Sequence, residues 1–289
     1  MRPPIIRLTA GSLMSGVPVP ANVKEPLVMV TTASLGPKLD AALRVGAFSG
    51  LGHDLVATVA DDLAALGARP VGVSCFRSPH FSNRENAIEE SLREACQIAG
   101  CVFLGMQSGL PTSTAPTMVG TAIGFADGAT LPAQEETKRG DVVIGMLTND
   151  LRLSGFESEI VDQIDGDGLG ALVQPPATIY TPAVMAAVEI GAVHGMVNIA
   201  RGGLAASLAR LAPEGLSVDL DQEAWSVPHV FRSLQNRLGY NAEAMFMHFN
   251  MGIGFLLAVV AEYAEPMLAV IGEYGGDPRI IGRMVATDG

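Results

Sequence analysis

The chain has 289 residues and a formal net charge of -12, from 18 basic and 30 acidic residues. This length can supply one large domain or two ordinary domains with their own cores, and the acidic balance disfavours a nucleic-acid partner. The three cysteines form neither a Cys-x-x-Cys pair nor a disulfide framework, and the longest apolar run is well short of the roughly 20 residues of a membrane helix. We therefore expect a cytoplasmic protein without a membrane partner.

The first half of the chain mixes strand and helix patterns. A strand is expected over 26–32, and the stretch VTTASLGPKL then reads as a strand end that runs into a small-residue loop carrying Lys38. Apolar residues at helical spacing predict a helix over 52–66, which Gly67 ends. A strand, a strongly periodic helix and two further strands are expected after it, over 70–76, 83–100, 101–106 and 118–126.

A polar, turn-rich segment over 127–141 predicts a connection between two domains, 1–134 and 135–289. The second half is expected to begin with a strand from Val142 and a helix from about Phe156. The stretch 187–213 then predicts a helix, a strand, a glycine turn and a second helix, which Pro213 ends. Near the C-terminus, strands are expected over 255–261 and 279–285, with a helix between them over 265–274. The predicted fold class is α+β or α/β, in two domains.

Three acids lie on the helix predicted over 52–66. Asp54 shares a helical face with either Asp61 or Asp62, and an acid in an apolar helix needs a partner when it is buried. A metal ion or a lysine would be such a partner. The alternative interpretation, a partly exposed helix face, carries no chemistry and is the commoner case.

A glycine pair precedes the helix that Pro213 ends. Backbone N–H groups of Gly202 and Gly203 at a helix start can bind a phosphate, and Arg201 would add positive charge. A Gly-Gly pair is also a common turn, so this pattern alone is weak. His248 and Asn250 beside the following glycine-rich strand are more often structural than catalytic, and the cysteines are expected to be buried and inert.

Several stretches together resemble one family. VPHVFRSLQNRLGYNAEAMFMHFNMGIGFLLAVV is similar to the C-terminal domain of phosphoribosylformylglycinamidine cyclo-ligases, with their V-P-x-I-F-x-x-L-Q and F-N-M-G-x-G motifs. GHDLVATVADDLAALGARPV, GDVVIGMLTNDLRLSGF and NIARGGL resemble three further motifs of the same family. The resemblance covers residues 24 to 286 in register, so we identify the chain as a divergent member.

The resemblance implies a fold and a reaction. The family has an N-terminal α/β domain whose strands form a barrel in a homodimer, and a C-terminal α+β domain. Its members use ATP to phosphorylate the formyl amide oxygen of a phosphorylated small molecule, formylglycinamidine ribonucleotide. An internal nitrogen then attacks the activated carbon and closes the imidazole ring. Proximity of the reacting atoms and neutralisation of charge are expected to supply most of the acceleration.

The resemblance also implies roles for residues at matching positions. Asp62 matches the aspartate of the family's N-D pair and Asp61 its asparagine, so both are expected to face Mg and the nucleotide. Asp62 and Lys38 are the expected catalytic residues. The residues expected to contact the nucleotide are Gly36, Lys38, Asp54, Asp61 and Gln107. The residues expected to contact phosphate are Asn149, Arg152, Gly202 and Gly203.

Two carboxylates of the family pattern are missing here. Ala33 stands where the family's T-D-G-V-G-T-K-L loop has an acid, and Gln107 replaces the glutamate of G-G-E. Arg152 replaces a histidine, as a new phosphate ligand or a solvated side chain, and the N-terminal extension with its phosphate-facing lysine is expected to be missing or cut down to IIRLTAGSLMSG. Weaker Mg-ATP binding is expected. Three alternatives stay open: the family's own reaction, a related reaction on another substrate, or a non-catalytic homologue.

Overall fold

The computed structural model describes residues 6–7, 15–16, 23–109, 116–128, 131, 136–164 and 166–287. The chain divides into two compact units. Unit 1 comprises Met1–Leu131 and Gly166–Pro182, and unit 2 comprises Pro132–Asp165 and Ala183–Gly289. The domain limits at residues 134 and 135 stay a prediction, and no local pattern in the sequence indicates that 166–182 belongs with unit 1. Most of the N-terminal segment IIRLTAGSLMSG lies outside the described residues.

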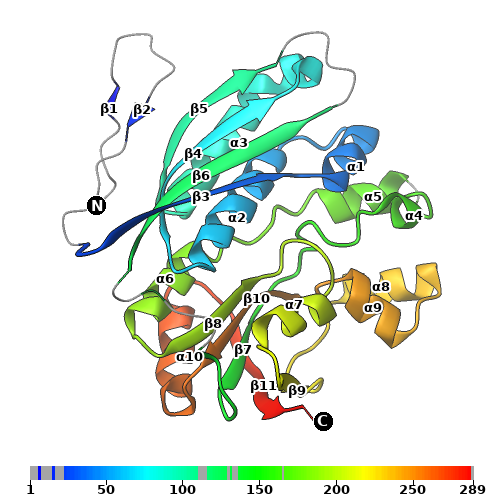
Figure 1. The fold of residues 1–289 in the computed structure, drawn as a ribbon. Coiled ribbons are helices and arrows are strands. Elements are labelled where there is room, and N and C mark those ends of the chain that lie inside the picture. The colour runs from blue at the N-terminus through cyan, green and yellow to red at the C-terminus, as the bar shows by residue number, and fades with distance from the viewer. Residues whose placement is uncertain are drawn as a thin grey trace. The chain divides into compact units, whose positions relative to one another are not determined.

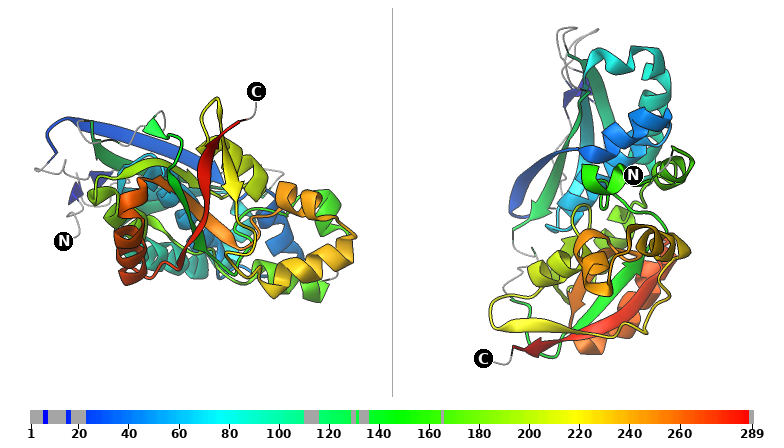
Figure 2. Two further views of the ribbon diagram at one scale, coloured as in Figure 1. Left: turned by 90° about the horizontal axis from the view of Figure 1, so that it is seen from below. Right: turned by 90° about the vertical axis from the view of Figure 1, so that its right-hand side faces the viewer.

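Unit 1 is built on a four-stranded sheet with the order β3-β6-β4-β5. The pairs β3–β6 and β4–β6 are antiparallel, whereas β4 and β5 are parallel. Helices α2 and α3 lie on one face of this sheet (Figure 1, and the right-hand view of Figure 2). The strands are β3 (Pro26–Ser34), β4 (Arg69–Arg77), β5 (Val102–Ser108) and β6 (Met118–Asp127), and a separate short pair is β1 (Ile6–Arg7) with β2 (Ser15–Gly16). The helices are α1 (Pro37–Val45), α2 (Leu51–Ala64), η1 (Pro79–Arg84), α3 (Glu85–Ile98) and α5 (Gly166–Val173).

Glycines set the position of α2 against its neighbours. A Cβ atom on Gly120 of β6 would lie 2.8 Å from the Leu55 side chain, and one on Gly52 would lie 2.6 Å from backbone atoms of α3. Such distances are too short for a real side chain, so glycine is required for this close packing. The helix is buried over nearly all of its length as a result. Asp54 and Asp61 are therefore carried into the interior of unit 1, whereas Asp62 is half-buried.

Unit 2 is built on a five-stranded antiparallel sheet with the order β8-β10-β7-β11-β9. Every residue of β10, which lies between β8 and β7, is buried, as expected for the apolar run that follows Gly254. The strands are β7 (Val142–Leu147), β8 (Val193–Asn198), β9 (Leu216–Leu220), β10 (Ile253–Val259) and β11 (Pro278–Ala286). The helices are α4 (Ser158–Val161), α6 (Thr181–Glu189), α7 (Leu204–Leu211), α8 (His229–Leu238), α9 (Ala242–His248), η3 (Ala261–Tyr263) and α10 (Ala264–Glu273).

The strands and helices expected over 26–32, 52–66 and 83–100 are confirmed, as is the helix–strand–turn–helix order of 187–213. Two expectations were wrong. The supposed loop after β3 is almost entirely regular structure, because β3 continues to Ser34 and α1 begins at Pro37, where proline is favoured in the first helical turn. The helix expected from Phe156 is instead two short helices, α4 and α5.

Candidate functional site

The predicted nucleotide loop between β3 and α1 consists of only two residues, Leu35 and Gly36. Gly36 has a positive φ of 54°, which glycine adopts without strain, and this allows the abrupt turn from strand to helix. Ala33, at the position of the family's acid, lies within β3 and pairs with Gly120 of β6. Lys38 is therefore a residue of the first turn of α1 rather than of the expected small-residue loop.

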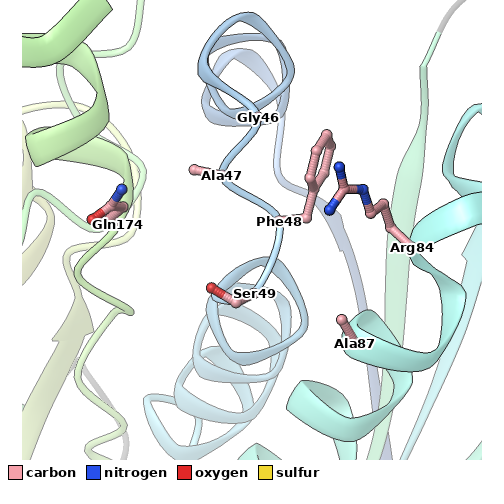
Figure 3. A pocket seen from close by; sticks show the side chains of 7 residues that line it. All are labelled: Gly46, Ala47, Phe48, Ser49, Arg84, Ala87 and Gln174. Carbon is pink, nitrogen blue, oxygen red and sulfur yellow. The ribbon is translucent and has the colours of Figure 1, made fainter.

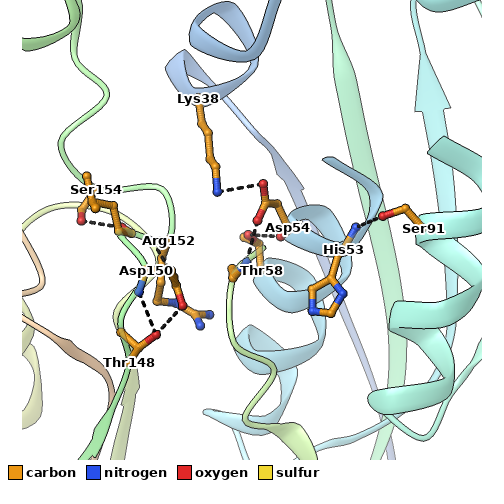
Figure 4. A network of polar contacts seen from close by, with 11 residues as sticks. Lys38, His53, Asp54, Thr58, Ser91, Thr148, Asp150, Arg152 and Ser154 are labelled. Carbon is orange, nitrogen blue, oxygen red and sulfur yellow. Dashed lines mark hydrogen bonds and ion pairs between the residues drawn. The ribbon is translucent and has the colours of Figure 1, made fainter. Parts of the chain in front are cut away.

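Lys38 and Asp54 form a buried ion pair (Figure 4). The Nζ atom of Lys38 lies 2.8 Å from Oδ2 of Asp54, and each side chain is only 1% exposed. The other carboxylate oxygen, Oδ1, accepts a hydrogen bond from the backbone N–H of Ala177 at 2.8 Å. The interpretation of this helix face as partly exposed was thus wrong for Asp54, and the alternative of a lysine partner is confirmed.

Asp61 and Asp62 have different surroundings although they are adjacent. Asp61 is fully buried, and its Oδ1 atom accepts hydrogen bonds from the backbone N–H groups of Tyr180 and Thr181 and from the Thr181 hydroxyl, at 2.8–2.9 Å. Asp62 is half-buried. The partly exposed interpretation was therefore wrong for Asp61 as well. The role of both residues in binding Mg stays a prediction.

The surroundings of Gln107 differ from those of Asp54 and Asp61, because Gln107 is exposed to solvent. It is an exposed residue of β5 and pairs in register with Phe76 of β4. Among the residues that the structure describes, no group of three or more His, Cys, Asp or Glu side chains could hold a metal ion. The described acids of unit 1 thus form no metal site made by protein ligands alone.

In unit 2, the predicted phosphate ligands lie in loops at one end of the sheet. Residue 147 of β7 pairs with residue 253 of β10, and Asn198 of β8 pairs with Phe255, so the end of β7, the end of β8 and the start of β10 meet. Hydrogen bonds join the loops that extend from these strands: Leu153 N–H donates to Ala200 O at 2.9 Å, and Asn250 Nδ2 donates to Asp150 O at 3.1 Å. We call residues 148–154, 198–204 and 249–252 the loop cluster.

Arg152 is buried within the loop cluster, with 1% of its surface exposed. Its Nη2 atom donates to Oδ1 of Asn198 at 3.0 Å, and its backbone N–H donates to Oδ1 of Asp150 at 2.7 Å. Oδ2 of the same carboxylate accepts a hydrogen bond from the Thr148 hydroxyl (Figure 4). The interpretation of Arg152 as a solvated side chain was therefore wrong, because a network of buried polar groups holds it inside unit 2.

Two further features mark the loop cluster. Arg152 and Met251 are the non-glycine residues with a positive φ, at 54° and 53°, in the described part of the chain. The Oδ1 atom of Asn250 is buried and accepts no hydrogen bond from any described residue. A buried carbonyl oxygen normally has a donor, and a strained backbone persists only where its surroundings impose it. Both features are typical of a site that receives a ligand.

The two glycines before α7 have distinct structural tasks. Gly202 has a positive φ of 70° and open space around it, whereas a Cβ atom on Gly203 would lie 2.0 Å from the backbone oxygen of Phe246. The pair therefore lets the chain turn and lets α7 begin against the end of α9. The turn interpretation explains both glycines, and their contact with phosphate stays a prediction.

Unit 1 has a pocket of about 380 Å³ whose lining includes none of the predicted site residues (Figure 3). Its lining includes Phe48 and Ser49 of the α1–α2 turn, Arg84 and Gln174. The Arg84 guanidinium carbon lies 5.2 Å from the centre of the Phe48 ring, which is a cation–π geometry. Sequence reasoning did not indicate this pocket.

The cysteines are buried and free, as expected. Burial raises the pKa of the Cys75 thiol to about 12, although the nearby Arg77 acts in the opposite direction. A hydrogen bond to Cys101, together with burial, raises the pKa of Cys96. A thiol whose pKa is raised holds little thiolate at neutral pH, so none of these observations supports a nucleophilic cysteine.

Sequence reasoning missed two polar residues of the loop cluster, Asp150 and Asn198, and treated Asn250 as structural. The available signal was a polar residue at the end of an apolar strand for Asn198, and one shortly after such a strand for Asp150. That signal becomes useful only with the strand order, because β7, β8 and β10 must be neighbours before their ends can meet.

No described helix is long and apolar enough to span a bilayer.

Comparison with protein families gives two matches. The model of the AIR synthase related protein, N-terminal domain, matches residues 21–126, and that of the AIR synthase related protein, C-terminal domain, matches residues 138–289. The chain belongs to the AIR synthase related family. This confirms the resemblance to cyclo-ligases and the two-domain α+β fold inferred from the motifs.

Individual relatives agree with this assignment. The chain is 28% identical to the phosphoribosylformylglycinamidine cyclo-ligase of Shouchella clausii (strain KSM-K16), over 93% of this chain and 83% of that protein. Among solved structures, thiamine-monophosphate kinase from Stenotrophomonas maltophilia K279a has a TM-score of 0.72 at 17% identity, covering 99% of this chain and 90% of its own. The hydrogenase maturation protein HypE in complex with ATP has a TM-score of 0.69 at 20% identity, with coverages of 96% and 81%. The two structural neighbours show a shared fold.

Proposed function

We propose that this protein is an ATP-using enzyme that activates an amide oxygen of a phosphorylated small molecule for ring closure. Formylglycinamidine ribonucleotide, or a related compound, is the proposed substrate. Family membership over both domains and the similarity to a cyclo-ligase over 93% of the chain support this reaction class. The structural neighbour solved in complex with ATP supports the choice of nucleotide.

The observation that carries the proposal is the loop cluster of unit 2. It combines a buried guanidinium at Arg152, a buried oxygen without a described donor at Asn250 and two non-glycine residues with positive φ. The planar fork of an arginine matches phosphate oxygens, and buried polar groups with open hydrogen-bonding capacity favour a polar ligand. We assign the phosphate group of the substrate to this cluster.

One residue of unit 1, Asp62, suits the proposed binding of Mg. Mg usually keeps several water ligands and is bound through one or two carboxylates together with the phosphates of a nucleotide. Asp62, which is half-buried on α2, fits that mode of binding, and the absence of a three-ligand group among the described residues does not conflict with it. When bound, Mg-ATP would supply the phosphoryl group that makes the amide oxygen a good leaving group.

The contribution of the chain's own residues would be to bind and orient the substrate. Ring closure joins two atoms of one molecule, so holding them at reacting distance removes much of the entropic barrier. The rigid hydrogen bonds of Arg152 with Asn198 and of Asn250 with Asp150 would fix the ligand in this way. The amide oxygen would leave the carbon as part of inorganic phosphate, the attacking nitrogen would take its place, and the proton lost by that nitrogen would pass to solvent.

Two residues favour the alternative of a non-catalytic homologue. Ala33 offers only a methyl group within β3, and Gln107 is a neutral, exposed side chain of β5, where the family pattern has carboxylates. Fewer carboxylates mean weaker attraction for Mg. Such a homologue would bind the phosphorylated ligand in unit 2 without turning over ATP. Release of ADP in the presence of substrate would exclude this alternative.

We also propose a homodimer formed through the strands of unit 1. Val28 and Val30 of β3 are 63% and 59% exposed, and Phe76 of β4 is 46% exposed. Exposed apolar side chains along a sheet are typical of an interaction surface. A second copy of the chain is the expected occupant, as the family resemblance implies. Light scattering should give twice the mass of the chain, and a monomeric mass would contradict the proposal.

The phosphate assignment is tested by Arg152→Gln, with Arg232→Gln as its control. Arg232 is an exposed residue of α8 in the same unit. Loss of hydrogen bonds to a charged ligand should weaken binding of formylglycinamidine ribonucleotide by about tenfold or more in Arg152→Gln, while Arg232→Gln binds like the wild type. Titration calorimetry measures both affinities, and circular dichroism checks the fold. Equal affinities for Arg152→Gln and the wild type would remove the phosphate from this cluster.

A further inference from the structure

Two carboxylates of α2 hold a distant part of the chain. The segment Gln174–Pro182, here called the connector, follows α5 and belongs to unit 1, and the chain enters unit 2 directly after it, at Ala183. Ala177 N–H donates to Asp54, whereas Tyr180 and Thr181 N–H groups donate to Asp61. The donors and acceptors of these bonds are more than 100 residues apart in the sequence.

The connector needs these acceptors. Ala177, Tyr180 and Thr181 are buried, and between α5 and α6 the connector has no helix or strand that would pair its backbone groups. A buried N–H group without an acceptor is strongly unfavourable. Asp54 and Asp61 are seven residues apart on α2, so they lie on one face of the helix and meet successive donors of the connector.

We infer that Asp54 and Asp61 are positioning residues that clamp the connector to α2, and that neither is a ligand of Mg or nucleotide. Lys38 is the counter-ion of the clamp, because its ammonium group balances the buried charge of Asp54. A carboxylate oxygen has two lone pairs, and Oδ1 of Asp61 already accepts three hydrogen bonds. That oxygen has no free direction for a cation. The clamp does not depend on the proposed function. The assignment of Mg to Asp62 alone does rest on the proposed function, because it requires that the protein uses Mg-ATP.

The clamp is tested by amide hydrogen exchange in the absence of any nucleotide. Asp61→Ala removes the acceptor, so exchange at Tyr180 and Thr181 should become at least about tenfold faster than in the wild type. Asp61→Asn keeps an acceptor oxygen, and its exchange should stay within about threefold of the wild type. Asp62→Asn, at the adjacent position, should leave these amides unchanged. Unchanged exchange in Asp61→Ala would overturn the clamp.

A milder variant covers the case in which Asp61→Ala does not fold. Thr181→Val keeps the shape of the side chain but removes one of the three donors to Asp61. Exchange at Tyr180 should then rise by about threefold. No change in exchange at Tyr180 would count against the clamp.

The metal assignment is tested separately with a non-hydrolysable ATP analogue. Asp61→Asn should bind the analogue with the same dependence on Mg as the wild type, and Asp62→Asn should lose this dependence. If Asp61→Asn loses it instead, Asp61 is a metal ligand and the inference is wrong. If the wild type shows no binding, the proposed use of ATP fails, and the exchange experiment still decides whether the clamp exists.

Discussion

Unit 1 and unit 2 both bury charged side chains, but they use them differently. In unit 1, Lys38 pairs with Asp54, and Asp54 and Asp61 accept hydrogen bonds from the connector. In unit 2, Arg152 has a positive φ, and the Oδ1 atom of Asn250 in the same loop cluster has no described donor. Buried polar groups that are satisfied within the protein stabilise one arrangement, whereas open capacity favours a ligand. Burial of a charge therefore does not by itself mark a functional residue.

The largest expected effect comes from removing the carboxylate that faces Lys38. Asp54→Ala leaves a buried ammonium group without its counter-ion and should lower the free energy of unfolding by about 3–5 kcal/mol. The double variant Lys38→Met/Asp54→Asn should recover most of this loss, because it buries no unpaired charge and keeps an acceptor for Ala177. Denaturation with urea measures all of these differences.

A matched control for this prediction is Asp40→Asn, which changes an exposed acid in the first turn of α1. Its free energy of unfolding should stay within about 0.5 kcal/mol of the wild type, as for most surface substitutions. If Asp54→Ala is as stable as Asp40→Asn, the pair of Lys38 and Asp54 does not hold unit 1 together. The contrast with unit 2 would then lose its basis.

A smaller effect is expected at the glycine pair in the loop cluster. Gly203→Ala places a Cβ atom 2.0 Å from the Phe246 backbone oxygen and should destabilise the protein by about 3 kcal/mol. Gly202→Ala meets no atom within 4 Å, but its φ of 70° is unfavourable for alanine, so a loss of about 1 kcal/mol is expected. Thermal and urea unfolding rank the two variants. The reverse order would show that close packing does not explain Gly203.

Much of the fold follows from local patterns, because apolar periodicity and flanking glycines identify α2, α3 and β10 without further information. The start of α1 does not follow from the local pattern, because small residues and one glycine suggest a loop, although Pro37 is also favoured as the first residue of a helix. The partners of Asp61 could not be predicted, since no spacing in the sequence indicates that Tyr180 and Thr181 return to α2.

The loop cluster was predicted only in part. The family motifs pointed to Asn149, Arg152, Gly202 and Gly203, and the structure places these residues in unit 2, in two loops joined by hydrogen bonds. The guanidinium of Arg152 donates a hydrogen bond to Asn198, which is the last residue of β8. The sequence shows neither the pairing of β8 with β10 nor the positive φ of Arg152. Tertiary contacts, rather than local preference, determine this part of the site.

The most direct test of the proposed function is calorimetric titration of the wild-type protein with a non-hydrolysable ATP analogue, in the presence and absence of Mg. We predict Mg-dependent binding with a dissociation constant near the micromolar range, which corresponds to a binding free energy of about -8 kcal/mol. We also predict that the Asp62→Asn variant loses this dependence on Mg. Absence of binding to the wild type would contradict the use of ATP. Unchanged Mg-dependent binding in Asp62→Asn would show that the metal is held elsewhere.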